Sequence, residues 1–107
     1  MQQIAAPVLR AWLDNAARTK PLLLDVREAW EFVRCHIDDS QLIPMAQLPQ
    51  HVNGIAHDAE VVVICHLGVR SLHAARFLER SGITWVYNLA GGIDAWAREV
   101  DPTMPRY

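Results

Sequence analysis

Hydrophobic residues gather in short runs along the chain, and these runs predict buried strands. Residues 61–65 form the clearest strand, because four β-branched residues follow one another there. The run 22–26 ends in charged residues, which suits a strand covered on both faces of a sheet. Segments 40–44 and 84–89 complete the set of predicted strands.

Helical spacing of apolar residues accounts for most of the sequence between these strands. From Ile93 onwards, apolar side chains recur at i, i+3, i+4 and i+7, which predicts an amphipathic helix after Gly92. Another helix begins near residue 70 or 71, and Gly82 offers its C-terminal cap. The remaining predicted helices are residues 7–17, 28–34 and 45–52. The same patterns assign all four tryptophans to the core: Trp12, Trp30, Trp85 and Trp96.

The alternation of strands with helices predicts the fold class. Strands separated by helices of about ten residues require crossover connections and therefore a parallel sheet. We predict one domain over residues 1–107, an open, mainly parallel α/β sheet with helices on both faces. Ligands gather at the carboxyl ends of the strands in such sheets, and Cys65 lies at that end of the most central-looking strand.

Composition and charge exclude several classes of protein. Hydrophobic residues make up 51% of the 107 residues and charged residues 21%, which excludes wholesale disorder. The formal net charge of −2 excludes a strongly basic nucleic-acid binder. Arg10 and Asp14 interrupt the first apolar stretch, so it is neither a secretory signal nor a membrane anchor. We expect a cytoplasmic protein with no nucleic-acid or membrane partner.

The segment 65–71 carries the candidate chemistry. A thiol leaves a buried strand there, and a helix begins five or six residues later. Amides at a helix start lack intrahelical acceptors, and Gly68 allows the loop to curl so that further N–H groups face the sulfur of Cys65. Arg70 and His66 add positive charge. This surrounding favours a reactive thiolate over an inert buried cysteine.

Four blocks of the chain resemble rhodanese-like single-domain sulfurtransferases. The segment 65–71 looks like the active-site loop of that family, and residues 22–28 look like its first block. Residues 35–37 with 43–44 are similar to its "GHI…IP" block, and 89–93 with Trp96 to its closing helix block. The blocks occur in the right order over nearly the whole chain. The resemblance implies an open, mainly parallel five-stranded sheet with helices on both faces.

The resemblance also implies a persulfide relay without a metal or an organic cofactor. Cys65 attacks the sulfane sulfur of a small donor such as thiosulfate, and an acceptor then takes that sulfur. The acceptor is expected to be either cyanide or a thiol, and the thiol belongs to a small molecule or to a carrier protein. By the same resemblance, Arg70 is expected to help bind the anionic donor. The residues that form the cradle are His66, Leu67, Gly68, Val69 and Arg70.

Three further residues are expected to support the site. Asp25 and Arg27 end a strand at the same sheet edge, so both can border the pocket. We expect Asp25 to accept loop hydrogen bonds or to pair with an arginine, and Arg27 to form a surface or rim ion pair. Ser71 stands at the expected helix start. Leu67 either makes the pocket mouth apolar, which favours a protein partner or carrier thiol, or packs against a neighbouring strand.

Two rival functions stay open at this point. One is a non-catalytic rhodanese-like module that binds a partner or senses redox state. The other is an arsenate reductase or phosphatase, although those enzymes typically have five residues between the cysteine and the arginine, where this loop has four. The histidines and cysteines show no familiar zinc spacing, which argues against a metal site.

Cys35 stands where the family usually has glycine. A glycine there suggests a positive φ, which a cysteine adopts only with strain unless the backbone bends differently. Cys35 is either a neutral replacement or a second redox thiol that resolves a persulfide on Cys65. Two cysteines are too few for a disulfide scaffold, but a single Cys35–Cys65 bridge stays possible.

Overall fold

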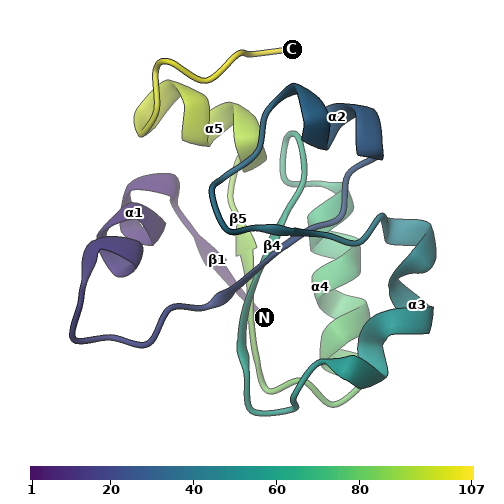
Figure 1. Cartoon of the computed structure of the whole chain (residues 1–107). Helices are drawn as coiled ribbons and strands as arrows, with labels where there is room; N and C mark the ends of the chain where they lie inside the picture. Colours follow the sequence, from purple (N-terminus) through teal and green to yellow (C-terminus); the bar gives the residue numbers. More distant parts are fainter.

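The computed structural model describes residues 1–107 and contains one five-stranded sheet (Figure 1). All strand pairs are parallel, and the order is β1-β5-β4-β2-β3. The strands are β1 (Gln2–Ile4), β2 (Leu22–Asp25), β3 (Gln41–Leu42), β4 (Glu60–Ile64) and β5 (Trp85–Leu89). The predicted open parallel sheet is therefore confirmed.

Strand β4 is the centre of the sheet and is buried on both faces. It pairs with β2 on one side and with β5 on the other. Val62 and Ile64 face one hydrophobic cluster, whereas Val61 and Val63 face the other. Side chains alternate across a strand, so an uninterrupted apolar run is what a strand covered on both faces requires.

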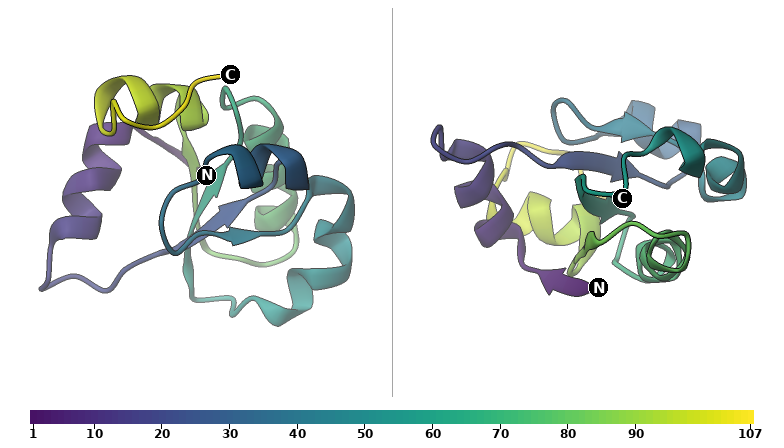
Figure 2. Two further views of the ribbon diagram at one scale, coloured as in Figure 1. Left: turned by 45° about the horizontal axis from the view of Figure 1, so that its top comes forward. Right: turned by 90° about the horizontal axis from the view of Figure 1, so that it is seen from below.

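Helices cover both faces of the sheet, as predicted (Figure 2). Apolar residues of α1 and α5 pack on one face, and those of α3 and α4 pack on the other. Helix α2 follows the carboxyl end of β2 and lies at that edge of the sheet (Figure 1). None of the helices has the length and hydropathy needed to cross a membrane. The helices are α1 (Ala6–Asp14), α2 (Ala29–Arg34), α3 (Leu48–His51), α4 (Arg70–Arg80) and α5 (Gly92–Glu99), with 3-10 turns η1 (Met45–Gln47) and η2 (Val52–Gly54) flanking α3.

The structure departs from the sequence pattern at the sheet edges and at two tryptophans. Strand β1 was not located by the pattern, because an edge strand of three residues with two exposed glutamines contains no apolar run. The segment 40–44 contains only the two-residue β3. Trp30 and Trp85 are 64% and 51% exposed, so their assignment to the core was wrong. The spacing of apolar residues alone does not reveal which helix face or strand end has no other element packed against it.

The start of α5 is pressed against the backbone that follows β4. The N–H of Ile93 donates to the carbonyl oxygen of Cys65 at 2.9 Å, and the N–H of Asp94 donates to that of His66 at 3.1 Å. Gly92 has a φ of +60°, and a Cβ atom there would lie 2.5 Å from the carbonyl oxygen of His66. The absence of a side chain at Gly92 therefore allows α5 to hold the carboxyl end of β4.

Replacing Gly92 with alanine should lower the free energy of unfolding by about 3 kcal/mol or more, because it adds backbone strain and a clash with carbonyl oxygens. Urea unfolding followed by far-UV circular dichroism measures the loss. The matched control is Gly54→Ala, since a Cβ atom there meets nothing within 4 Å. Equal unfolding midpoints for the two variants would contradict the close approach of α5.

Candidate active site

The loop between β4 and α4 places Cys65 at the carboxyl edge of the sheet. Gly68 has a φ of +97°, so the curl of the loop does use the conformational freedom of glycine. The curl brings the N–H of Gly68 to 3.0 Å from the sulfur of Cys65, to which it donates a hydrogen bond. Of the predicted ring of donors, this is the one loop amide that bonds the sulfur itself.

Cys65 lies at the floor of a small pocket. The residue is 1% exposed and belongs to the hydrophobic cluster on the α4 face of the sheet. The pocket has a volume of about 140 Å³ and is lined by Cys65, His66, Leu67, Val69 and Arg70. These are four of the five predicted cradle residues together with the cysteine, while Gly68 contributes its amide. The structure thus brings the predicted loop residues together around one thiol.

Ser71 and Asn88 form a buried polar pair beneath the thiol. The hydroxyl of Ser71 donates to the side-chain oxygen of Asn88, and its oxygen lies 3.2 Å from the sulfur of Cys65. The side-chain amide of Asn88 donates to the carbonyl oxygen of Gly68 at 3.1 Å, which braces the loop. Ser71 is therefore a supporting residue. Sequence reasoning missed Asn88, whose one signal was a polar residue within the apolar strand β5.

Asp25 and Arg27 form an ion pair that is completely buried. Nη2 of Arg27 donates to the Asp25 carboxylate at 2.7 Å and to the carbonyl oxygen of Cys35 at 2.7 Å. The expectation that Asp25 pairs with an arginine is met, whereas the expected surface or rim position of Arg27 was wrong. The chain segments after β2 fold over this guanidinium. A buried charge is tolerated only where its N–H groups have hydrogen-bond acceptors. Neither residue lines the cysteine pocket, so the expectation that both border it is not met.

Glu31 holds Arg70 through a bidentate ion pair. Nη1 and Nη2 of Arg70 donate to the two carboxylate oxygens at 2.7 and 2.9 Å. The hydrogen bonds from Arg70 lower the pKa of Glu31 to about 2 although burial opposes the shift. The hydrogen bonds to Glu31 raise the pKa of Arg70 although burial opposes the shift. Glu31 is the one buried residue of α2, and nothing in the sequence pattern singled it out.

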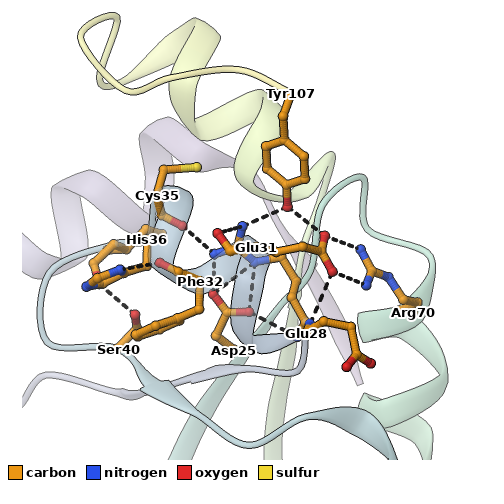
Figure 3. A network of polar contacts seen from close by, with 11 residues as sticks. Asp25, Glu28, Glu31, Phe32, Cys35, His36, Ser40, Arg70 and Tyr107 are labelled. Atoms are coloured by element: carbon orange, nitrogen blue, oxygen red, sulfur yellow. Dashed lines mark hydrogen bonds and ion pairs between the residues drawn. The ribbon is translucent and has the colours of Figure 1, made fainter.

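Tyr107 joins these two ion pairs (Figure 3). Its hydroxyl donates to Glu31 at 2.7 Å and accepts from Nη1 of Arg27 at 2.7 Å. Its ring stacks on the imidazole of His66, with 4.0 Å between ring centroids. The C-terminal segment thus returns to the cysteine loop.

Cys35 lies apart from the cysteine pocket. Its φ of −167° is extended backbone, so the expected strain is absent and the backbone bends differently from the glycine pattern. Both cysteines are free, and they belong to clusters on opposite faces of the sheet. The structure therefore gives no support to a Cys35–Cys65 bridge or a resolving role for Cys35. No three His, Cys, Asp or Glu side chains come together in a way that could hold a metal ion.

Comparisons with known proteins identify the family of this domain. A family model described as a rhodanese-like domain matches residues 9–99. The Mycobacterium tuberculosis protein named "Probable adenylyltransferase/sulfurtransferase MoeZ" is 38% identical over an alignment of 108 positions, which covers 92% of this chain and 25% of that protein. This chain therefore spans about a quarter of that relative's length. A protein named "Sulfurtransferase" from Allochromatium vinosum is 40% identical over 83 residues, which cover 78% of each chain.

A solved structure gives the same result for the fold. The rhodanese-like domain protein from Staphylococcus aureus superposes with a TM-score of 0.85 at 28% identity, covering 100% of this chain and 99% of that one. The family model covers most of the sequence, and the structural match covers all of it. This chain belongs to the rhodanese-like domain family.

Proposed function

We propose that this protein is a sulfurtransferase in which Cys65 carries the transferred sulfur as a persulfide. The observation that carries the proposal is the sulfur of Cys65 at the floor of a small pocket, with the Gly68 amide donating to it. Relatives whose names include sulfurtransferase support the general class of reaction. Thiosulfate as donor, and a thiol or cyanide as acceptor, are the finer part of the proposal.

The reaction proceeds in two displacements on sulfur. The thiolate of Cys65 attacks the sulfane sulfur of thiosulfate, a new S–S bond forms, and the old one breaks as sulfite leaves with its electron pair. In the second step, an acceptor thiolate or cyanide attacks the outer sulfur and the Cys65 thiolate is the leaving group. The enzyme returns to its starting state, so no external oxidant or reductant is consumed.

The surroundings of Cys65 support the anionic forms of this cycle. The Gly68 N–H donates to the sulfur, and a hydrogen bond to an ionised group is stronger than one to a neutral group. The outer persulfide sulfur extends into the pocket, toward the start of α4 and its unpaired amides.

The rim of the pocket supports a thiol-bearing acceptor. Leu67 and Val69 are 58% and 63% exposed, so Leu67 rims the mouth and does not pack against a strand. An apolar rim suits the alkyl chain of a small thiol or the surface of a carrier protein.

Incubating the protein with thiosulfate should add about 32 Da, one sulfur atom, to its intact mass. Cys65→Ser should abolish the addition, because it removes the attacking sulfur. Cys35→Ser is the matched control and should keep the adduct, since Cys35 lies outside the cysteine pocket. Wild-type protein that gains no mass, or an adduct that survives in Cys65→Ser, would contradict the proposed carrier.

Arg70→Ala should raise the KM for thiosulfate about tenfold and change kcat less, because the guanidinium at the pocket acts chiefly in donor binding. Two of its five N–H groups bond Glu31, which leaves three for a donor anion. A steady-state cyanide assay separates the two constants. Arg76→Ala, on the exposed side of the same helix, is the control and should match wild type. An unchanged KM in Arg70→Ala would remove this residue from donor binding.

A further inference from the structure

We propose that Tyr107 is a positioning residue of the cysteine pocket, whose hydroxyl fixes the Glu31 carboxylate and through it the guanidinium of Arg70. The inference deepens the proposed function and rests on it, because it assigns to Tyr107 the placement of the charge that an anionic donor meets. Tyr107 itself is absent from the pocket lining. Its hydroxyl therefore acts on the pocket through Glu31.

The hydrogen bonds of Glu31 show why the carboxylate needs an anchor. One oxygen accepts from Nη1 of Arg70 and from the N–H of Glu28, at 2.7 and 3.1 Å. The other accepts from Nη2 of Arg70 and from the Tyr107 hydroxyl, at 2.9 and 2.7 Å. The Glu28 amide holds only the first oxygen. The tyrosine therefore prevents the carboxylate from turning about that point and carrying Arg70 with it (Figure 3).

The hydroxyl of Tyr107 is itself held in one orientation. Arg27 has donors only, so the phenol oxygen accepts from Nη1 of Arg27 and the phenol proton is directed to Glu31. Arg27 is completely buried and fixed by Asp25 and the carbonyl oxygen of Cys35. Burial raises the pKa of Tyr107 to about 12, so the group stays a neutral donor at neutral pH. A chain of hydrogen bonds therefore runs from Arg27, after the end of β2, through Tyr107 and Glu31 to the rim of the pocket.

The ring of Tyr107 holds the tyrosine hydroxyl beside the cysteine loop. It stacks on His66 with an interplanar angle of 9°, and Trp30 meets it edge-on with 5.7 Å between centroids. Phenylalanine keeps these ring contacts and removes only the hydroxyl. Tyr107→Phe therefore separates the positioning of Arg70 from the packing of the tail.

The test compares two alkylating probes that differ in charge. Iodoacetate is an anion and iodoacetamide is uncharged, and in both reactions the Cys65 sulfur displaces iodide. The ratio of the two rate constants reports the positive charge at the pocket. It requires no sulfur transfer, so it can fail or succeed independently of the proposed function. All variants carry Cys35→Ser, and mass spectrometry of the Cys65 peptide follows the reaction.

Tyr107→Phe should lower the iodoacetate-to-iodoacetamide ratio about 3- to 10-fold, the effect expected of one hydrogen bond to a charged group. The iodoacetamide rate alone should stay near wild type, because the Gly68 amide at the sulfur is untouched. In the thiosulfate assay, the same variant should raise KM with little change in kcat. The matched control is Tyr87→Phe, which also removes a tyrosine–glutamate hydrogen bond, to Glu60 at 3.2 Å. Its ratio should equal that of wild type.

A double-mutant cycle separates positioning from general stability. In an Arg70→Ala background, Tyr107→Phe should cause no further fall in the ratio, since the group it positions is gone. An unchanged ratio in the single variant, or an equal additional fall in the Arg70→Ala background, would overturn the proposal. If Tyr107→Phe lowers both alkylation rate constants by the same factor, the proposal is overturned as well, because Tyr107 would then act on the thiol. A Tyr107→Phe protein that is unfolded at 25 °C by circular dichroism would assign the hydroxyl to stability and would also overturn it.

Discussion

The cysteine pocket depends on the contact between the start of α5 and the backbone that follows β4. Two amides of α5 bond the carbonyl oxygens of Cys65 and His66, and Gly92 allows this approach because it has no side chain. With its carbonyl oxygens held from this side, the loop curls so that the Gly68 amide reaches the sulfur. A backbone contact between two distant segments thereby fixes the geometry of a single thiol. The position of the Cys65 thiol is therefore a consequence of how helix α5 packs against the backbone that follows the central strand.

A second layer of structure places charge around that thiol. Asp25, Arg27, Glu31 and Arg70 alternate in sign, and the Tyr107 hydroxyl joins the two ion pairs. No buried side-chain nitrogen or oxygen lacks a hydrogen-bond partner, which is the condition under which buried charges are tolerated. The network leaves Arg70 as the cation at the pocket rim, with a fixed partner and N–H groups to spare. Fixed charges that need no rearrangement are the ones that stabilise an anionic reaction most effectively.

The sequence was sufficient for the features that arise from local patterns. The apolar run 61–65 predicted the central strand, and the order of cysteine, glycine and arginine predicted the loop and the helix after it. Features set by long-range packing were not predictable in this way. Strand β1 has no apolar pattern, the burial of Arg27 depends on the segments that cover it, and Tyr107 reaches Glu31 across 76 residues of chain. The extended backbone of Cys35 was not predictable either, because a family pattern with glycine at this position gives no φ value for the residue that replaces it.

The most direct test of the account is a crystal structure of the protein after reaction with thiosulfate. The account predicts one additional sulfur atom bonded to the sulfur of Cys65, directed into the pocket and within hydrogen-bond distance of amides of the loop 66–70. It also predicts that Arg70 keeps its pairing with Glu31. Extra density on Cys35, or an outer sulfur that points into the apolar cluster between the sheet and α4, would contradict the central claim.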